Sequence, residues 1–251
     1  MEIPIVYEDD DLLVIDKPSG LVVNRAESVK EETVTDWAEK RIKNYAFAPS
    51  SGRGELGIKN NEAEDFYNRA GIVHRLDKET SGLLLIAKNP QAFSNLQAQF
   101  RERLVEKKYQ ALVHGIVVPE KGEIKASVGR LAWNRERFGV IAGGREAVTS
   151  YIVLSTFKTR LGNFSLLEVT PHTGRTHQIR IHLKYLGFPV VSDSFYAGRK
   201  TARGDRSFCP RLFLHAISLK FRHPEAGEYL IVESKLPEDL EKVLGSLKSK
   251  M

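Results

Sequence analysis

The segment HRLDKETSG at residues 74–82 runs directly into the apolar stretch LLLIA at 83–87, and this junction decides how the chain is interpreted. A continuous apolar run bounded by turn-forming residues predicts a strand buried on both faces. Polar and charged side chains crowd the approach to it, namely His74, Arg75, Asp77 and Lys78. Because a buried strand does not require such neighbours, we take the end of this strand as a candidate functional site.

Asp77 can be interpreted in two ways from its neighbours alone. A carboxylate beside a buried strand is partly desolvated, which favours the neutral acid unless a cation compensates. Arg75 points away from it in an extended segment, so the cation would come from elsewhere in the chain. Alternatively, Asp77 accepts hydrogen bonds from the amides of Thr80 or Ser81 and only closes a turn. Both interpretations remain open at this point.

The segment TGRTHQIR at 173–180 is the second candidate site. The pattern predicts a helix from this segment to Gly187, with Thr176 as a cap. His177, Arg180 and Lys184 follow at spacings of three and four, so neighbours along the series share a helix face. One of these cations can pair with a buried carboxylate while others meet phosphates. A solvated amphipathic helix is the alternative, and it suits Lys184 best.

The positive charge of the chain is concentrated near this segment. The formal net charge is +6, yet residues 171–223 alone hold ten Lys or Arg and only two Asp or Glu. Such a local excess favours a polyanionic partner, most simply nucleic acid. A solvated surface without a partner is the alternative. Arg175 belongs to the same window and adds to the charge that phosphates would meet.

Tyr109 lies on a predicted strand that begins with Lys107 and Lys108. A tyrosine on a strand usually packs in the core or at its rim. The two lysines favour a strand that starts at a basic surface. The rest of the chain predicts a mixed α+β fold, because strands and helices do not alternate strictly. We expect one domain over residues 1–251, with a long loop at 44–70.

Several functional classes are excluded by missing patterns. The chain has no GxGxxG after a strand, no GxxxxGK[ST] and no GxSxG, so no nucleotide cofactor is expected. No metal is expected, because His172, His177 and His182 are five residues apart and would face different sides of a helix. One cysteine, Cys209, excludes an internal disulfide and favours a reducing, cytoplasmic compartment. No apolar run reaches the roughly 20 residues that cross a bilayer, so no membrane association is expected.

These segments, taken together, resemble the RluA-type pseudouridine synthases, which isomerise uridine in RNA. The likeness extends over nearly the whole chain and follows the order of the family's motifs. HRLDKETSG resembles the central motif. The other matching segments are YEDDDLLVIDKPSGLVV at 7–23, KKYQALVHG at 107–115, TGRTHQIRIHLKYLGFPVVSD at 173–193, FYAG at 195–198 and RLFLHAISLKFRHP at 211–224.

The resemblance implies a fold and roles for individual residues. The fold would be a mixed, mainly antiparallel sheet bent around a central cleft and flanked by helices. Asp77 matches the family's catalytic aspartate, Tyr109 its active-site tyrosine and Arg180 the arginine paired with the aspartate. The resemblance places Arg75 where an arginine helps to flip the target base. We expect His74, Lys107, Arg175, Thr176, His177 and Lys184 to contact RNA or to shape the site.

The resemblance leaves the RNA target open. Many relatives carry an N-terminal S4-type RNA-binding domain, whereas here the first motif begins at residue 7. We therefore expect target selection from the catalytic domain or from loops at 44–70 and 199–210. Large-subunit ribosomal RNA is the expected substrate, and transfer RNA is the alternative. A catalytically inactive RNA-binding protein on the same scaffold is the rival class. No cofactor is implied, and a monomer is expected.

Overall fold

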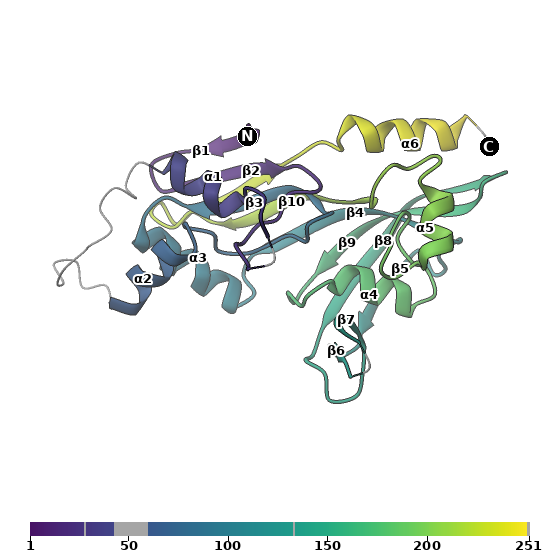
Figure 1. The fold of residues 1–251 in the computed structure, drawn as a ribbon, viewed down its shortest axis with the longest axis horizontal. Helices are drawn as coiled ribbons and strands as arrows, with labels where there is room; N and C mark the ends of the chain where they lie inside the picture. The colour runs from purple at the N-terminus through teal and green to yellow at the C-terminus, as the bar shows by residue number, and fades with distance from the viewer. Residues whose placement is uncertain (28, 43–59, 133, 250–251) are drawn as a thin grey trace. The chain divides into compact units, whose positions relative to one another are not determined.

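The computed structural model describes residues 1–27, 29–42, 60–132 and 134–249 (Figure 1). The chain divides into two compact units. Unit 1 comprises residues 1–105 and 218–234, and unit 2 comprises residues 106–217 and 235–251. The predicted single domain stays a prediction. Of the predicted loop at 44–70, residues 44–59 lie outside the described residues.

Unit 1 is built on antiparallel strands. β2 (Leu12–Lys17) pairs with β1 (Ile5–Glu8) on one side and β3 (Ser81–Ala87) on the other, with Lys17 opposite Gly82. All seven residues of β3 are buried, which confirms the strand predicted after the HRLDKETSG segment. β10 (Leu214–Arg222) contributes its second half to this unit and forms a hairpin with β11 (Tyr229–Glu233).

In the described part of unit 1, three helices accompany these strands. α3 (Pro90–Arg101) begins as the sequence predicts, because the Asn89 side chain accepts a hydrogen bond from the amide of Ala92 at 2.8 Å. Its predicted apolar stripe ends early, since Leu104 lies beyond the helix and is 53% exposed. α1 spans Val34–Arg41 and α2 spans Asn60–Asn68.

The helix α2 corrects the loop expected at 44–70 over residues 60–68. Its sequence, NNEAEDFYN, carries only Ala63, Phe66 and Tyr67 as apolar residues, so their helical spacing of three and four is a weak signal. Tertiary packing stabilises this helix, because Phe66 is buried and its ring meets that of Phe93 edge-on at 5.7 Å. The core of unit 1 gathers around this pair and includes Leu12, Val14, Val73, Leu83, Leu85, Leu96, Leu219 and Phe221.

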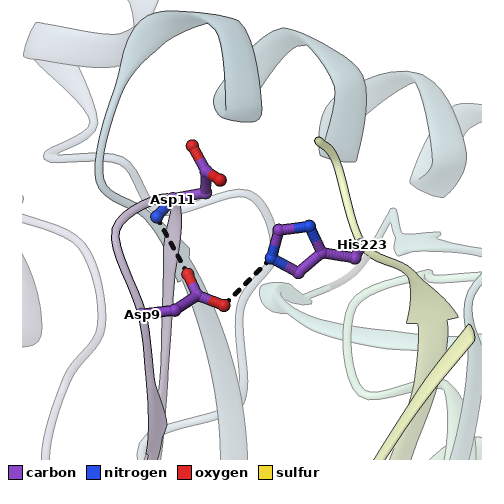
Figure 2. Close-up of side chains that lie close together, drawn as sticks. All are labelled: Asp9, Asp11 and His223. Atoms are coloured by element: carbon purple, nitrogen blue, oxygen red, sulfur yellow. Dashed lines mark hydrogen bonds and ion pairs between the residues drawn. The ribbon is translucent and has the colours of Figure 1, made fainter. Parts of the chain in front are cut away.

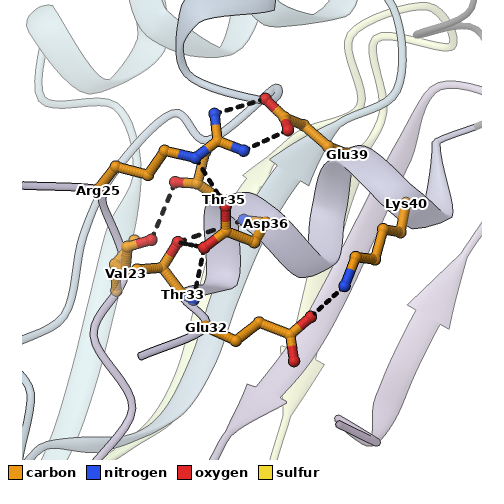
Figure 3. Close-up of polar contacts among 8 residues, drawn as sticks. All are labelled: Val23, Arg25, Glu32, Thr33, Thr35, Asp36, Glu39 and Lys40. Atoms are coloured by element: carbon orange, nitrogen blue, oxygen red, sulfur yellow. Dashed lines mark hydrogen bonds and ion pairs between the residues drawn. The ribbon is translucent and has the colours of Figure 1, made fainter. Parts of the chain in front are cut away.

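The start of α1 holds the chain that follows β2 (Figure 3). Thr33 and Asp36 form a reciprocal cap, and Arg25 donates to Asp36 at 2.7 Å and to Glu39 at 2.7 Å. Hydrogen bonds from Thr33, followed by Arg25, lower the pKa of Asp36 to about 2. Thr35 donates its hydroxyl to the carbonyl of Val23 at 2.9 Å. These bonds fix residues 21–25 against the helix.

Unit 2 contains a second set of antiparallel strands. Their order is β4 (Glu106–His114), β9 (Gly162–Pro171), β8 (Val148–Thr159) and β5 (Lys121–Lys125). The β8–β9 pair confirms the hairpin predicted around residues 159–163. A smaller hairpin of β6 (Val128–Leu131) and β7 (Asn134–Val140) was not predicted.

The helices of unit 2 are α4 (Gln178–Tyr185), α5 (Arg199–Asp205) and α6 (Glu238–Lys248). The helix α5 corrects the loop expected at 199–210 over residues 199–205. The predicted C-terminal helix is confirmed and packs its apolar side on the strands, together with the buried Cys209. That core includes Leu112, Phe157, Phe164, Val191, Phe213, Leu240, Val243 and Leu247.

The predicted class is confirmed as a mixed α+β fold with mainly antiparallel strands. Among the described residues, no helix combines the length and the apolar composition needed to cross a membrane.

Candidate active site

Asp77 opens the tight turn that leads into β3 in unit 1. The turn is closed by its own backbone, since the amide of Thr80 donates to the carbonyl of Asp77 at 3.2 Å. The alternative in which the Asp77 carboxylate caps the turn at Thr80 or Ser81 stays a prediction. Asp77 is half-buried, as expected for a carboxylate between solvent and core.

The loop after β2 holds this turn through backbone carbonyls. Lys17 is fully buried, and its Nζ donates to the carbonyls of Pro18 and Leu21, each at 2.9 Å, and to that of Lys78 at 3.2 Å. The amide of Gly20 donates to the same Lys78 carbonyl at 2.8 Å. Ser19 donates its hydroxyl to the carbonyl of Glu79 at 2.7 Å. The segment KPSG at 17–20 thus fixes the Asp77 turn.

The contact with the Asp77 turn requires a glycine at position 20. Gly20 has a φ of +87°, a left-handed conformation that a residue with a Cβ rarely adopts. This backbone geometry is the one in which the amide of Gly20 reaches the carbonyl of Lys78. In the sequence, these contacts with the Asp77 turn are therefore indicated by a lysine and a glycine, Lys17 and Gly20, placed three residues apart ahead of HRLDKETSG.

His74 and Arg75 differ in their surroundings. The Nε2 of His74 accepts a hydrogen bond from the amide of Leu85 at 3.0 Å, and its ring stacks on Phe100 at 4.7 Å. These contacts make His74 part of the scaffold that supports β3. Arg75 is exposed, which is compatible with a contact to RNA. The RNA-binding roles of both residues stay predictions.

Tyr109 lies in unit 2, on β4 opposite Val169 of β9, and is 8% exposed. The strand position predicted from sequence is therefore confirmed, whereas its catalytic role stays a prediction. Two residues earlier on the strand, burial lowers the pKa of Lys107 to about 8. Lys108 forms an ion pair with Glu168 of β9 at 3.1 Å. The beginning of β4 therefore combines an aromatic ring with an amine whose pKa is lowered by burial.

The helix predicted from residue 173 begins later than expected. α4 starts at Gln178, and the residue before it is His177 in a left-handed conformation with φ +55°. The N-terminus has no side-chain cap, so the expected cap by Thr176, which is exposed, is wrong. The end predicted at Gly187 is confirmed by its φ of +90° and by its amide bond to the carbonyl of Lys184.

Buried polar contacts explain the late start of α4. The Oε1 of Gln178 accepts from the hydroxyl of Thr173 at 2.7 Å and from the amide of Arg175 at 3.0 Å. Its Nε2 donates to the carbonyl of Val148 at 3.0 Å. These bonds wind residues 173–177 into a loop that the spacing alone does not reveal. The Nε of Arg175 donates to the carbonyl of Glu146 at 3.0 Å, whereas Lys184 is exposed, as its surface interpretation expects.

Arg180 is the most deeply enclosed of the predicted site residues. Its side chain is 3% exposed and forms a two-pronged ion pair with Asp193, through Nε to Oδ2 and Nη2 to Oδ1, each at 2.8 Å. The rings of Phe195 and Tyr196 lie 5.6 and 5.1 Å from its guanidinium carbon. Sequence reasoning missed Asp193, although it is one of only two acidic residues in the basic window 171–223.

The predicted site residues therefore fall in two units. His74, Arg75 and Asp77 belong to unit 1, and Tyr109, Arg180 and the remaining residues belong to unit 2. Within unit 2, the hydroxyl of Tyr196 lies 2.7 Å from Nδ1 of His177, which joins His177 to the surroundings of Arg180. The pairing of Asp77 with Arg180 stays a prediction.

A separate group in unit 1 has the composition of a metal site but the hydrogen bonds of a scaffold (Figure 2). The side chains of Asp9, Asp11 and His223 offer ligand atoms within 4.8 Å of one another. The Nδ1 of His223 accepts from two backbone amides, so Nε2 carries the proton that it donates to Asp9 at 2.9 Å. Although burial raises it, hydrogen bonds from Tyr7 and the backbone leave the pKa of Asp9 lowered. A structural role accounts for this group.

Comparison with known proteins identifies the class. A model of the RNA pseudouridylate synthase family matches residues 11–185, and the chain belongs to this family. The likeness to the RluA-type enzymes stated from the sequence is thereby confirmed. The chain is a pseudouridine synthase, an isomerase that acts on uridine in RNA.

Particular relatives share most of the chain. A Bacillus subtilis protein named "Uncharacterized RNA pseudouridine synthase YlyB" is 38% identical over 248 residues, covering 99% of this chain and 74% of the relative. A Pseudomonas aeruginosa protein named "Ribosomal large subunit pseudouridine synthase D" is 38% identical, covering 95% and 70%. The structure of human RNA pseudouridylate synthase domain containing 1 aligns with a TM-score of 0.68 at 25% identity, covering 99% and 95%.

Proposed function

We propose that this chain converts uridine to pseudouridine in structured RNA and that its substrate is large-subunit ribosomal RNA. The observation that carries the proposal is the 38% identity, over 95% of this chain, to a relative named as a ribosomal large-subunit pseudouridine synthase. The basic window at 171–223 supports a polyanionic substrate. Transfer RNA is the competing substrate.

The reaction needs no redox agent. The N1–C1′ glycosidic bond of uridine breaks, the base turns within the site, and a C5–C1′ bond forms. The hydrogen at C5 is released to solvent, and N1 gains a proton. In the proposed assignment Asp77 attacks C1′ or C6, or assists removal of a proton from the sugar. Arg180 pairs with the Asp77 carboxylate in this assignment and orients it toward the nucleoside.

Tyr109 and the basic side chains complete the assignment. Tyr109 stacks on the uracil ring and relays a proton. The target base must leave its stack, which costs a few kcal/mol, and Arg75 helps to hold the vacated position. Phosphate contacts offset this cost, and the candidates are Lys107, Arg175, Thr176, His177 and Lys184. His74 supports the turn from behind through β3.

Mapping pseudouridines in total RNA from cells with and without the gene tests the proposal. We expect at least one large-subunit ribosomal position to lose pseudouridine and to regain it when the gene is restored. A loss confined to transfer RNA would overturn the substrate. An unchanged map in cells lacking the gene, together with RNA binding by the purified chain, would favour the inactive RNA-binding protein.

A further inference from the structure

The ion pair between Arg180 and Asp193 is more than a surface contact. Both side chains are buried, Arg180 at 3% exposure and Asp193 at 0%. Two parallel N–H···O bonds fix the guanidinium plane as well as its distance from the carboxylate. Because Asp193 occupies the Nε–Nη2 edge, Arg180 can meet a second carboxylate only through its Nη1–Nη2 edge. The ion pair with Asp193 thus determines the direction in which the Nη1–Nη2 edge of Arg180 points.

Asp193 is itself immobilised by the backbone that follows it. Its Oδ1, which accepts from Arg180, also accepts from the amides of Phe195 and Tyr196, each at 2.9 Å. The carbonyl of Asp193 accepts from the amide of Ala197 at 3.0 Å. The carboxylate therefore sits in a turn that cannot rotate without losing several hydrogen bonds.

The aromatic residues of the same turn enclose Arg180. The Asp193 turn places the rings of Phe195 and Tyr196 within 5.6 and 5.1 Å of the guanidinium carbon. The hydroxyl of Tyr196 in turn contacts His177, the residue that precedes α4. One short segment thus supplies the charge that pairs with Arg180 and the rings that border it.

We propose that Asp193 is a positioning residue for uridine isomerisation, which orients Arg180 toward the catalytic carboxylate. This inference rests on the proposed role of Arg180 beside Asp77. Asp193 also balances the charge of the buried guanidinium, so Arg180 contributes direction as much as charge.

The variant Asp193→Asn tests this role with little change in shape. The amide oxygen can keep the place of Oδ1, which accepts from Arg180 and from the amides of Phe195 and Tyr196. The amide nitrogen then faces the Nε–H of Arg180, and two donors repel. The turn should persist while the ion pair is lost.

Asp239→Asn is the matched control. The carboxylate of Asp239 also forms a two-pronged ion pair with an arginine, accepting from Nε of Arg211 at 2.5 Å and from its Nη2 at 3.0 Å. This control therefore breaks an ion pair of the same kind in unit 2 without touching Arg180.

The substrate is total RNA labelled with [5-³H]uridine from cells that lack the gene, so the assay does not depend on the target. Each pseudouridine releases one tritium from C5. We expect Asp193→Asn to lower the single-turnover rate about 100-fold, as for a misplaced catalytic group. The RNA dissociation constant should change less than about twofold, and Asp239→Asn should keep the rate within about threefold. If Asp193→Asn does not fold, Asp193→Glu, which moves the carboxylate by one methylene, should show the same loss of rate.

A double-mutant cycle separates positioning from general stability. Asp193→Asn added to Arg180→Met should cost no further rate, because Asp193 acts through Arg180. The losses from Asp239→Asn and Arg180→Met should instead multiply. Wild-type rates in Asp193→Asn and Asp193→Glu, or multiplying losses in the first pair, would overturn the inference alone. A wild-type chain that releases no tritium would overturn the proposed function and this inference with it.

Discussion

The Asp77 turn of unit 1 and the Arg180 site of unit 2 hold their functional side chains by different means. The turn is fixed through backbone carbonyls at positions 78 and 79, which accept from Lys17, Ser19 and Gly20. Arg180 is fixed through its own guanidinium, by the carboxylate of Asp193 and two rings. In unit 1 these hydrogen bonds fix the backbone of the Asp77 turn, whereas in unit 2 the contacts fix the Arg180 side chain itself.

This difference predicts where each region is sensitive to substitution. A turn held by its carbonyls should tolerate new side chains at the residues that supply those carbonyls. It should not tolerate loss of the donors. A buried ion pair should be sensitive at both partners, because removing one leaves the other charged and unpaired.

Asp77→Asn should have the largest effect on activity. The substitution keeps the backbone that closes the turn, since Thr80 donates to the Asp77 carbonyl. It removes the proposed reacting carboxylate, so we expect tritium release to fall by at least about 10³-fold. Thermal unfolding and RNA binding should stay near wild type. Full activity in this variant would refute the assignment of Asp77.

Arg180→Lys should come next. A lysine keeps the positive charge but cannot form two parallel hydrogen bonds with Asp193. We expect a loss of about 100-fold in the single-turnover rate, with a lower melting temperature because the buried carboxylate is poorly satisfied. If the rate is unchanged while the melting temperature falls, the arginine serves the fold rather than the reaction.

Lys17→Met tests the other region through its donors. The change leaves the carbonyls of Pro18, Leu21 and Lys78 without their Nζ donor. We expect the free energy of unfolding, measured in urea, to fall by about 2–4 kcal/mol. Ser19→Ala removes a single bond to the Glu79 carbonyl and should cost about 1 kcal/mol. Equal losses of unfolding free energy in the two variants would contradict the prediction that Lys17 is the main donor holding the Asp77 turn.

The two regions also differ in how far the sequence alone foretold them. The buried β3 strand, the Asn89 cap and the β8–β9 hairpin follow local patterns of burial and turns, and the structure confirms them. The motif resemblance singled out Asp77 and Arg180. The partner of Arg180 was missed, because Asp193 is 13 residues away and their contact depends on the turn after α4.

The two wrong predictions, a loop over residues 60–68 and a helix over residues 173–177, have a common physical cause. Helix α2 carries few apolar residues and gains its burial from Phe93 of α3. Residues 173–177 were predicted to be helical because their spacing suits a helix. In the structure they form a loop, whose polar groups donate hydrogen bonds to the side chain of the buried Gln178. Tertiary hydrogen bonds and packing override local propensity at such places.

The pH dependence of RNA binding offers a test of unit 2 alone. Burial lowers the pKa of Lys107 to about 8, so its amine is charged below that pH and neutral above it. If Lys107 meets a phosphate, RNA binding should weaken by about fivefold between pH 7 and pH 9.5, the value of one exposed ion pair. Lys107→Arg should bind with no such change, because arginine stays charged throughout. The same pH dependence in wild type and variant would place the titrating group elsewhere.

Lys78→Ala should have the smallest effect and gives the sharpest test of the comparison. Lys78 supplies a carbonyl to Lys17 and Gly20, but its side chain is exposed and meets Glu31 at 3.7 Å in an exposed pair. Alanine keeps the carbonyl, so we expect the rate within about twofold of wild type and a change in stability below about 0.5 kcal/mol. A loss as large as that of Lys17→Met would mean that the side chains, rather than the backbone, hold the Asp77 turn. The contrast between the two regions would then disappear.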